Sequence, residues 1–170
     1  AGFMMVERFG MDVQQLTTLY FINLILNIGL APLMGRAVAR YGERNALVLE
    51  YFGLALVFFA YGGIYLFGWG ILIAASLYIL DHLFFALALA IKTYFQKIAD
   101  PQDIAATAAV AFTINHIAAI FLPVSLGFLW LKSPFLVFCT AGTLAIFSFV
   151  LALLIPREPR IGKETIFCVS

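Results

Sequence analysis

Charge is scarce in this sequence, and the scarcity excludes one class of partner. Only 11% of the 170 residues are charged, against about 25% in an ordinary soluble domain, and the formal net charge is +1. The ten Lys and Arg residues are scattered thinly, without a basic stripe interleaved with aromatic residues. We therefore exclude nucleic acid as a partner.

Cysteine and the common catalytic motifs are also scarce. The two cysteines are Cys139, inside an apolar run, and Cys168, in the polar tail, so we expect free thiols rather than a disulfide or a metal pair. There is no H-E-x-x-H motif, no Gly-rich phosphate loop and no Cys-His arrangement. We expect no enzyme, no metal and no cofactor, and no use of ATP.

Long apolar runs dominate what remains. Hydrophobic residues make up 64% of the chain, against about 45–50% in soluble domains. A helix needs about 20 mostly apolar residues to cross a bilayer, and transmembrane strands would instead show alternating segments of about 10 residues. We predict an all-α membrane protein with a polar tail over 156–170 and five transmembrane helices, at about 16–34, 46–67, 71–91, 104–130 and 134–155.

The basic residues predict how these helices are oriented in the membrane. Short cytoplasmic loops are enriched in Lys and Arg. One side of the predicted bundle has eight of them and the other has only Arg8 and Lys132. The eight are Arg36, Arg40, Arg44, Lys92, Lys97, Arg157, Arg160 and Lys163. We therefore expect an integral protein of the plasma membrane, the inner membrane in a bacterium, with a cytoplasmic C-terminus and with Trp69 and Trp130 at the outer interface.

The segment after the first predicted helix carries a recognisable pattern, Gly35-Arg36-Ala37-Val38-Ala39-Arg40-Tyr41-Gly42-Glu43-Arg44. It resembles the cytoplasmic signature of the major facilitator superfamily, G-x-x-x-D-[RK]-x-G-[RK]-[RK]. The pattern is matched by Gly35, Arg40, Gly42 and Arg44, and it is broken at two places, Ala39 and Glu43. Glycines permit a tight turn, and clustered arginines can meet carboxylates such as Glu43 and Glu50. The alternative is that the arginines only enforce topology.

The resemblance extends over essentially the whole chain and implies an architecture. The five helices look like the eighth to twelfth of this family, which forms half of a two-lobed bundle. The chain opens at Ala1 without an initiator Met, so we expect it to be cut from a longer protein with a six-helix N-terminal lobe. Membership would imply a secondary transporter that moves a small solute by alternating access, with the N-terminal lobe and the bilayer as its other partners.

Polar residues within the predicted helices are the candidates for function. Asp81 lies roughly 15 Å into the third helix, near the midplane, where an ionised carboxylate costs about 2.5–3.5 kcal/mol on insertion scales. His82 follows it, and Asn115 and His116 lie at a similar depth in the fourth helix. Because histidine titrates near physiological pH, we hypothesise that this group binds and releases protons. The alternative is a buried hydrogen bond that fixes helix packing.

Asn23 and Asn27 are four residues apart in the first helix and share a face. They are candidates for lining an aqueous cavity, although asparagines also hydrogen-bond between packed helices. For the whole chain, the alternative to a transporter is a helical membrane scaffold or a receptor-like subunit. Such a protein has no need of a charge in mid-membrane, so Asp81 favours the transporter.

Overall fold

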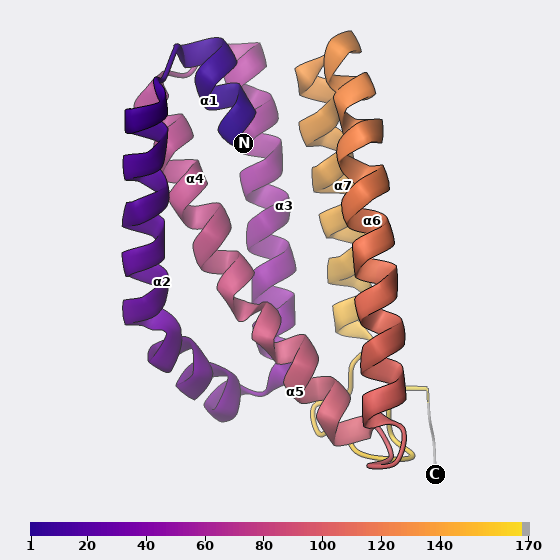
Figure 1. The fold of residues 1–170 in the computed structure, drawn as a ribbon. Coiled ribbons are helices and arrows are strands. Elements are labelled where there is room, and N and C mark those ends of the chain that lie inside the picture. Colours follow the sequence, from indigo (N-terminus) through magenta and orange to yellow (C-terminus); the bar gives the residue numbers. More distant parts are fainter. Residues whose placement is uncertain (168–170) are drawn as a thin grey trace.

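Helices account for nearly all the regular structure in the computed structural model, which describes residues 1–167 (Figure 1). They are α1 (Gly2–Phe9), α2 (Val13–Tyr41), α3 (Glu43–Phe67), α4 (Ile71–Phe85), the 3-10 segment η1 (Ala86–Ala88), α5 (Leu89–Ile98), α6 (Ile104–Lys132) and α7 (Pro134–Leu153). Residues 1–167 contain no strand beyond one isolated bridge in the tail. The predicted all-α membrane fold is confirmed, while the thiol predicted at Cys168 lies outside the described residues.

Five segments are long and apolar enough to cross a membrane, as the sequence predicts. They are Val13–Tyr41, Glu43–Phe67, Ile71–Ile98, Ile104–Lys132 and Pro134–Leu153. The protein is therefore described as an integral membrane protein, with α1 as a short additional helix near the N-terminus.

The first spanning helix is longer than predicted at both ends, because local capping rather than hydropathy sets its limits. At its start, the Asp12 side chain accepts a hydrogen bond from the Gln15 backbone N–H at 2.7 Å, and the Gln15 side chain accepts one from Asp12 N–H at 3.2 Å. At its other end, α2 continues to Tyr41 and stops at Gly42, whose φ of +84° favours glycine. The expectation of a loop between the first two spans was therefore wrong, since Gly42 alone separates α2 from α3.

The third span is also longer than predicted. The chain continues from α4 through η1 into α5, so it remains helical to Ile98 rather than ending near residue 91. The helix continues beyond its apolar stretch because lysine is a good helix former, so Lys92 and Lys97 can remain helical outside the hydrocarbon. Only residues 99–103 connect it to α6.

Helix α3 is at the centre of the packing. It supplies more buried residues than any other helix, and α7 packs along much of its length. The close approach of α3 to α4 depends on Gly53, because a Cβ atom there would overlap the ring of Phe84. By contrast, α6 packs mainly on α7 and none of its residues is buried.

The two ends of the bundle differ in charge. The turns at Gly10–Asp12, Gly68–Gly70 and Ser133 lie at one end with α1, and Gly42, residues 99–103 and the tail lie at the other (Figure 1). All eight basic residues that the sequence assigns to the cytoplasm belong to segments at this second end. The arrangement agrees with the predicted sidedness, and the orientation in a membrane stays a prediction.

Candidate functional site in the membrane

Asp81 and His82 lie side by side on α4 and are both partly open. Their side chains are 20% and 37% exposed, and His82 Nδ1 is 3.8 Å from Asp81 Oδ2. The same Nδ1 lies 3.0 Å from the backbone oxygen of Tyr78, one turn earlier. A proton on Nδ1 would therefore be donated to Tyr78 O, and the carboxylate is too far for a strong ion pair. Asp81 makes no hydrogen bond within residues 1–167.

Two buried tyrosines belong to the surroundings of Asp81. Asp81 interacts electrostatically with Tyr61 on α3 and with Tyr78. Tyr61 is 0% exposed, and its hydroxyl has no hydrogen-bond partner in the described chain. A buried hydroxyl without a partner costs about 1–3 kcal/mol, so the protein retains a polar group here at the expense of stability.

Asn23 adds a second unpaired group to this region. It is 2% exposed, and neither atom of its amide group finds a partner within residues 1–167. Asn23 follows Leu19 by one turn on α2, and Leu19 shares a buried cluster with Tyr78 of α4, so Asn23 faces the α4 side. Asn27 donates to the Asn23 backbone oxygen at 2.9 Å. Asn23 thus lies within the helix packing rather than on an open cavity, whereas Asn27 is half-buried.

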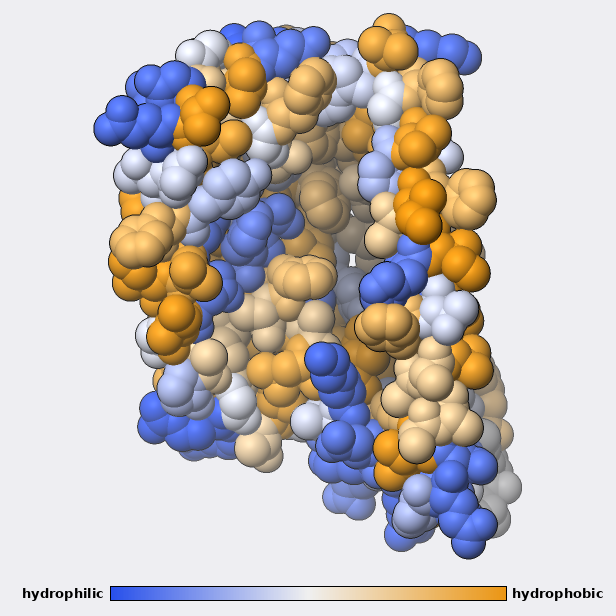
Figure 2. All heavy atoms as spheres, viewed as in Figure 1, coloured by the Kyte–Doolittle hydropathy of each residue, from blue (hydrophilic) through white to orange (hydrophobic). Residues whose placement is uncertain are grey.

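Asn115 and His116 are on the surface of α6. Both are exposed, and His116 Nδ1 lies 2.9 Å from the Phe112 backbone oxygen. Neither is hydrogen-bonded or ion-paired to Asp81 or His82 in the described structure. Figure 2 shows hydrophilic surface at mid-height on α6 and, across a hollow, over α4. The structure therefore places the predicted group on two separate walls instead of in one contact cluster.

The chain matches no protein-family model, no curated protein and no solved structure. The resemblance to the major facilitator superfamily therefore rests on the signature segment and the helix pattern.

The signature segment, residues 35–44, does not form the arginine–carboxylate contacts that the sequence predicts. Gly35 lies inside α2, where a Cβ atom would meet nothing within 4 Å, so only Gly42 needs to be glycine. Arg40 lies over the ring of Tyr41, 5.6 Å from its centroid. Among residues 1–167 neither Arg40 nor Arg44 pairs with a carboxylate.

The expected partner of these arginines binds a lysine instead. Glu43 forms an ion pair with Lys97 of α5 at 2.6 Å, and the Glu43 side chain is only 5% exposed. The pair joins the start of α3 to the end of α5. The pair could not be predicted from the sequence, because the predicted third helix stops six residues before Lys97.

Glu50 is the polar residue whose importance the sequence prediction missed. It is 2% exposed and one of its carboxylate oxygens, Oε2, has no hydrogen-bond partner in the part of the chain described. The available signal was its position, because it lies inside the predicted second span at 46–67. We had assigned it only as a partner for the arginines.

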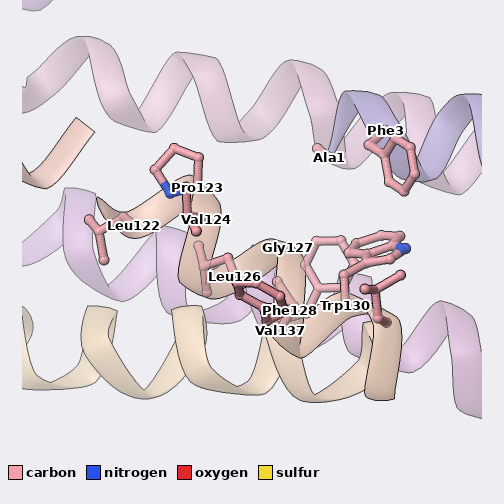
Figure 3. A pocket seen from close by; sticks show the side chains of 12 residues that line it. Ala1, Phe3, Leu122, Pro123, Val124, Leu126, Gly127, Phe128, Trp130 and Val137 are labelled. Carbon is pink, nitrogen blue, oxygen red and sulfur yellow. The ribbon is translucent and has the colours of Figure 1, made fainter. Parts of the chain in front are cut away.

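A large apolar cavity is lined by residues of α1, α6 and α7 and by Ala1, whose amino group interacts electrostatically with Asp81. Its volume is about 790 Å³, and Phe3 of α1 and Trp130 of α6 face each other at one end, with Pro123 of α6 further along (Figure 3). Trp130 Nε1 donates to Glu7 Oε2 at 2.8 Å, which ties α6 to α1. No predicted site residue lines this cavity, so it does not mark the polar site.

Proposed function

We propose that the chain is one lobe of a secondary active transporter of the major facilitator type, which moves a small solute by alternating access. The observation that carries this proposal is Asp81, an acidic side chain at mid-depth in a spanning helix, partly exposed and without a hydrogen bond to any of residues 1–167. Insertion of such a group costs about 2.5–3.5 kcal/mol, and ionisable residues kept inside membranes commonly mark ion or substrate pathways.

In this function Asp81 and His82 exchange a proton. At 3.8 Å the carboxylate and the imidazole are too far apart to share a hydrogen, so the transfer requires a rotation of the His82 ring away from Tyr78 O or a bridging water. The Tyr61 hydroxyl, unpaired within residues 1–167, interacts electrostatically with Asp81 and can donate a hydrogen bond to its ionised form when the two groups approach each other. Protonation of Asp81 removes its charge, which lowers the free energy of moving this part of the lobe against lipid or against the second lobe.

The exposed residues of α6 supply the other wall. Asn115 can both donate and accept hydrogen bonds, and His116 can do so in its neutral form. Helix α6 has no buried residue and packs mainly on α7 rather than on α4, and the Trp130–Glu7 hydrogen bond joins it to α1. We assign Asn115 and His116 to solute contact and proton transfer across the hollow, with the second lobe and the bilayer as partners.

A ligand screen on the full-length protein tests this function. The purified protein is heated with a library of solutes and drugs in mildly acidic and in mildly alkaline buffer. A ligand that binds only the folded state raises stability by RT ln(1 + [L]/Kd), so substrates shift the unfolding temperature upward. We expect a hit that depends on pH and is lost in Asp81→Asn. Hits that survive in Asp81→Asn with unchanged pH dependence would refute the assignment of the site.

The matched control is Asp100→Asn. Asp100 is an exposed carboxylate in the connector before α6, and its side chain accepts a hydrogen bond from Gln102 N–H that asparagine can also accept. This variant makes the same chemical change outside the membrane. We expect it to bind the ligand as the wild-type protein does.

A further inference from the structure

Glu50 is a buried carboxyl group that the function proposed above does not use. Only 2% of the residue is exposed, and Oε2 has no hydrogen-bond partner within residues 1–167. An ionised carboxylate in such surroundings is far less stable than the neutral acid, so a group of this kind normally carries a proton. The first question is whether any nearby cation could stabilise the ionised form.

On α3, Glu50 occupies the face that packs against α4, η1 and α5. Two turns nearer the start of α3, Glu43 binds Lys97 of α5, and one turn in the other direction Gly53 lies against Phe84 of α4. Positions three and seven residues away share the face of Glu50. Glu50 therefore lies between these contacts, opposite η1, which α3 also touches.

The charged groups on the surrounding elements leave Glu50 without a counter-ion. Helix α7 has no charged residue between Pro134 and Leu153. The titratable groups on the other surrounding elements are Tyr20, Arg36, Arg40 and Tyr41 on α2, Glu43, Arg44, Tyr51, Tyr61 and Tyr65 on α3, Tyr78, Asp81 and His82 on α4, Lys92, Tyr94 and Lys97 on α5, and Arg157, Glu158, Arg160, Lys163 and Glu164 in the tail. None of these forms an ion pair or hydrogen bond with Glu50 in the described chain, and Lys97 is already bound to Glu43.

The hydrogen-bonding pattern of the spanning helix changes opposite Glu50. The chain passes from α-helix to a 3-10 turn at η1 and back to α-helix in α5. Such a turn inside a long helix often marks a hinge. Movement there would separate α5 from α3 without disturbing the packing of α4 around Gly53.

A cavity approaches Glu50 from the end of the bundle that contains Gly42. Its volume is about 340 Å³, and it is lined by Leu47 and Tyr51 of α3 together with residues of α5, α7 and the tail. Leu47 lies one turn before Glu50 and Tyr51 directly follows it. Glu50 itself does not line the cavity, but two of the lining residues are within one turn of it on α3, so a short movement of α5 would connect the carboxyl group to the cavity.

We propose that Glu50 is a proton-binding site that exchanges its proton through this cavity with the predicted cytoplasmic side. The site holds one proton in the conformation described here, and separation of α5 from α3 at the Glu43–Lys97 pair opens it. Its occupation by a proton stands independently of transport. Its role as a second proton carrier beside Asp81 rests on the proposed function.

Labelling with dicyclohexylcarbodiimide tests the site directly, because this apolar reagent modifies protonated carboxyl groups. The full-length protein is treated in lipid nanodiscs over a range of pH, and the modified residue is located by peptide mass spectrometry. We expect strong modification of Glu50 in mildly acidic buffer, declining as the pH rises into the alkaline range, and no label at position 50 in Glu50→Gln. In the control Asp100→Asn, which changes an exposed carboxylate outside the membrane, the label on Glu50 should persist.

Two results would overturn the proposal. One is the absence of label on Glu50 at every pH, and the other is protection of Glu50 by Na⁺ at constant pH and ionic strength, which would assign the site to a metal cation. Failure of the transport function appears separately, as a wild-type protein that is labelled at Glu50 but binds and moves no solute.

Thermal unfolding gives an independent readout that needs no reagent. The folded protein holds Glu50 neutral at a pH where the unfolded chain has already ionised it, so raising the pH from mildly acidic to neutral should lower the unfolding temperature of the wild type. Glu50→Gln cannot ionise, and its unfolding temperature should fall less over the same range. Identical pH dependence in the two proteins would contradict a proton on Glu50.

Discussion

The contact between Gly53 and Phe84 allows a quantitative test of how α3 and α4 pack. A Cβ atom at position 53 would overlap the aromatic ring of Phe84, so Gly53→Ala must move the ring or separate the two helices. Gly29 of α2 is the matched control, because a Cβ atom there meets nothing within 4 Å. Both glycines are inside long helices, so both substitutions make the same change to the backbone.

The expected magnitude follows from the difference between the two variants. Alanine in a helix is favoured over glycine by roughly 0.5–1 kcal/mol, so Gly29→Ala should be more stable than the wild type by about that amount. Gly53→Ala has the same gain but also the cost of overpacking, typically about 1–3 kcal/mol. The overpacking cost is therefore the difference between them, and at about 2–4 °C for each kcal/mol Gly53→Ala should unfold at least about 2 °C below Gly29→Ala.

The assay is thermal unfolding of the purified variants in the same detergent, followed by circular dichroism. Phe84→Leu in the Gly53→Ala background should recover part of the loss, since the smaller side chain makes room for the new methyl group. Equal stability of the two alanine variants would refute the close approach of α3 and α4 at this point. A double variant no more stable than Gly53→Ala would show that the loss arises elsewhere.

Two further substitutions test polar contacts. Lys97→Met leaves the buried Glu43 carboxylate without its partner and should lower the free energy of unfolding by about 1–3 kcal/mol. The double variant Glu43→Gln/Lys97→Met should recover part of this loss in thermal unfolding. Equal losses in the single and the double variant would show that the ion pair is not responsible. Tyr61→Phe removes a buried hydroxyl that has no partner and should leave the unfolding temperature unchanged or higher, while reducing ligand-dependent stabilisation if the hydroxyl serves Asp81. A clear fall in the ligand-free unfolding temperature would show that the hydroxyl is bonded within the fold.

The sequence predicts the number of spanning helices well because each is a long apolar run, but it predicts their ends poorly. Hydropathy falls where a chain leaves the hydrocarbon, and a helix can continue beyond that point. Residues 35–41 and 92–98 show this, since both are helical despite their basic residues. The end of α2 is instead set by the backbone conformation of Gly42, which a pattern of apolar residues does not report.

The candidate site was only partly predictable. The depth of a residue in a helix can be counted along the chain, but the side of the helix that packs against its neighbours cannot. The count places Asp81 and His116 near the same level, but it does not say that α6 packs mainly on α7 and leaves His116 exposed. Burial of Asn23 and Glu50 likewise depends on which helices lie against them. A charged residue near the predicted end of a span, such as Glu50, can be assigned equally well to the span or to the loop until the packing is known.

The central claim is that Asp81 carries a proton during solute transport, and uptake into proteoliposomes tests it most directly. The full-length protein is reconstituted with a solute found in the ligand screen, and uptake is measured with and without an imposed pH gradient. We predict that the gradient drives accumulation in the wild type and in Asp100→Asn, and that Asp81→Asn loses gradient-driven accumulation while unfolding at a temperature close to that of the wild type. Full gradient-driven accumulation in Asp81→Asn would contradict the claim.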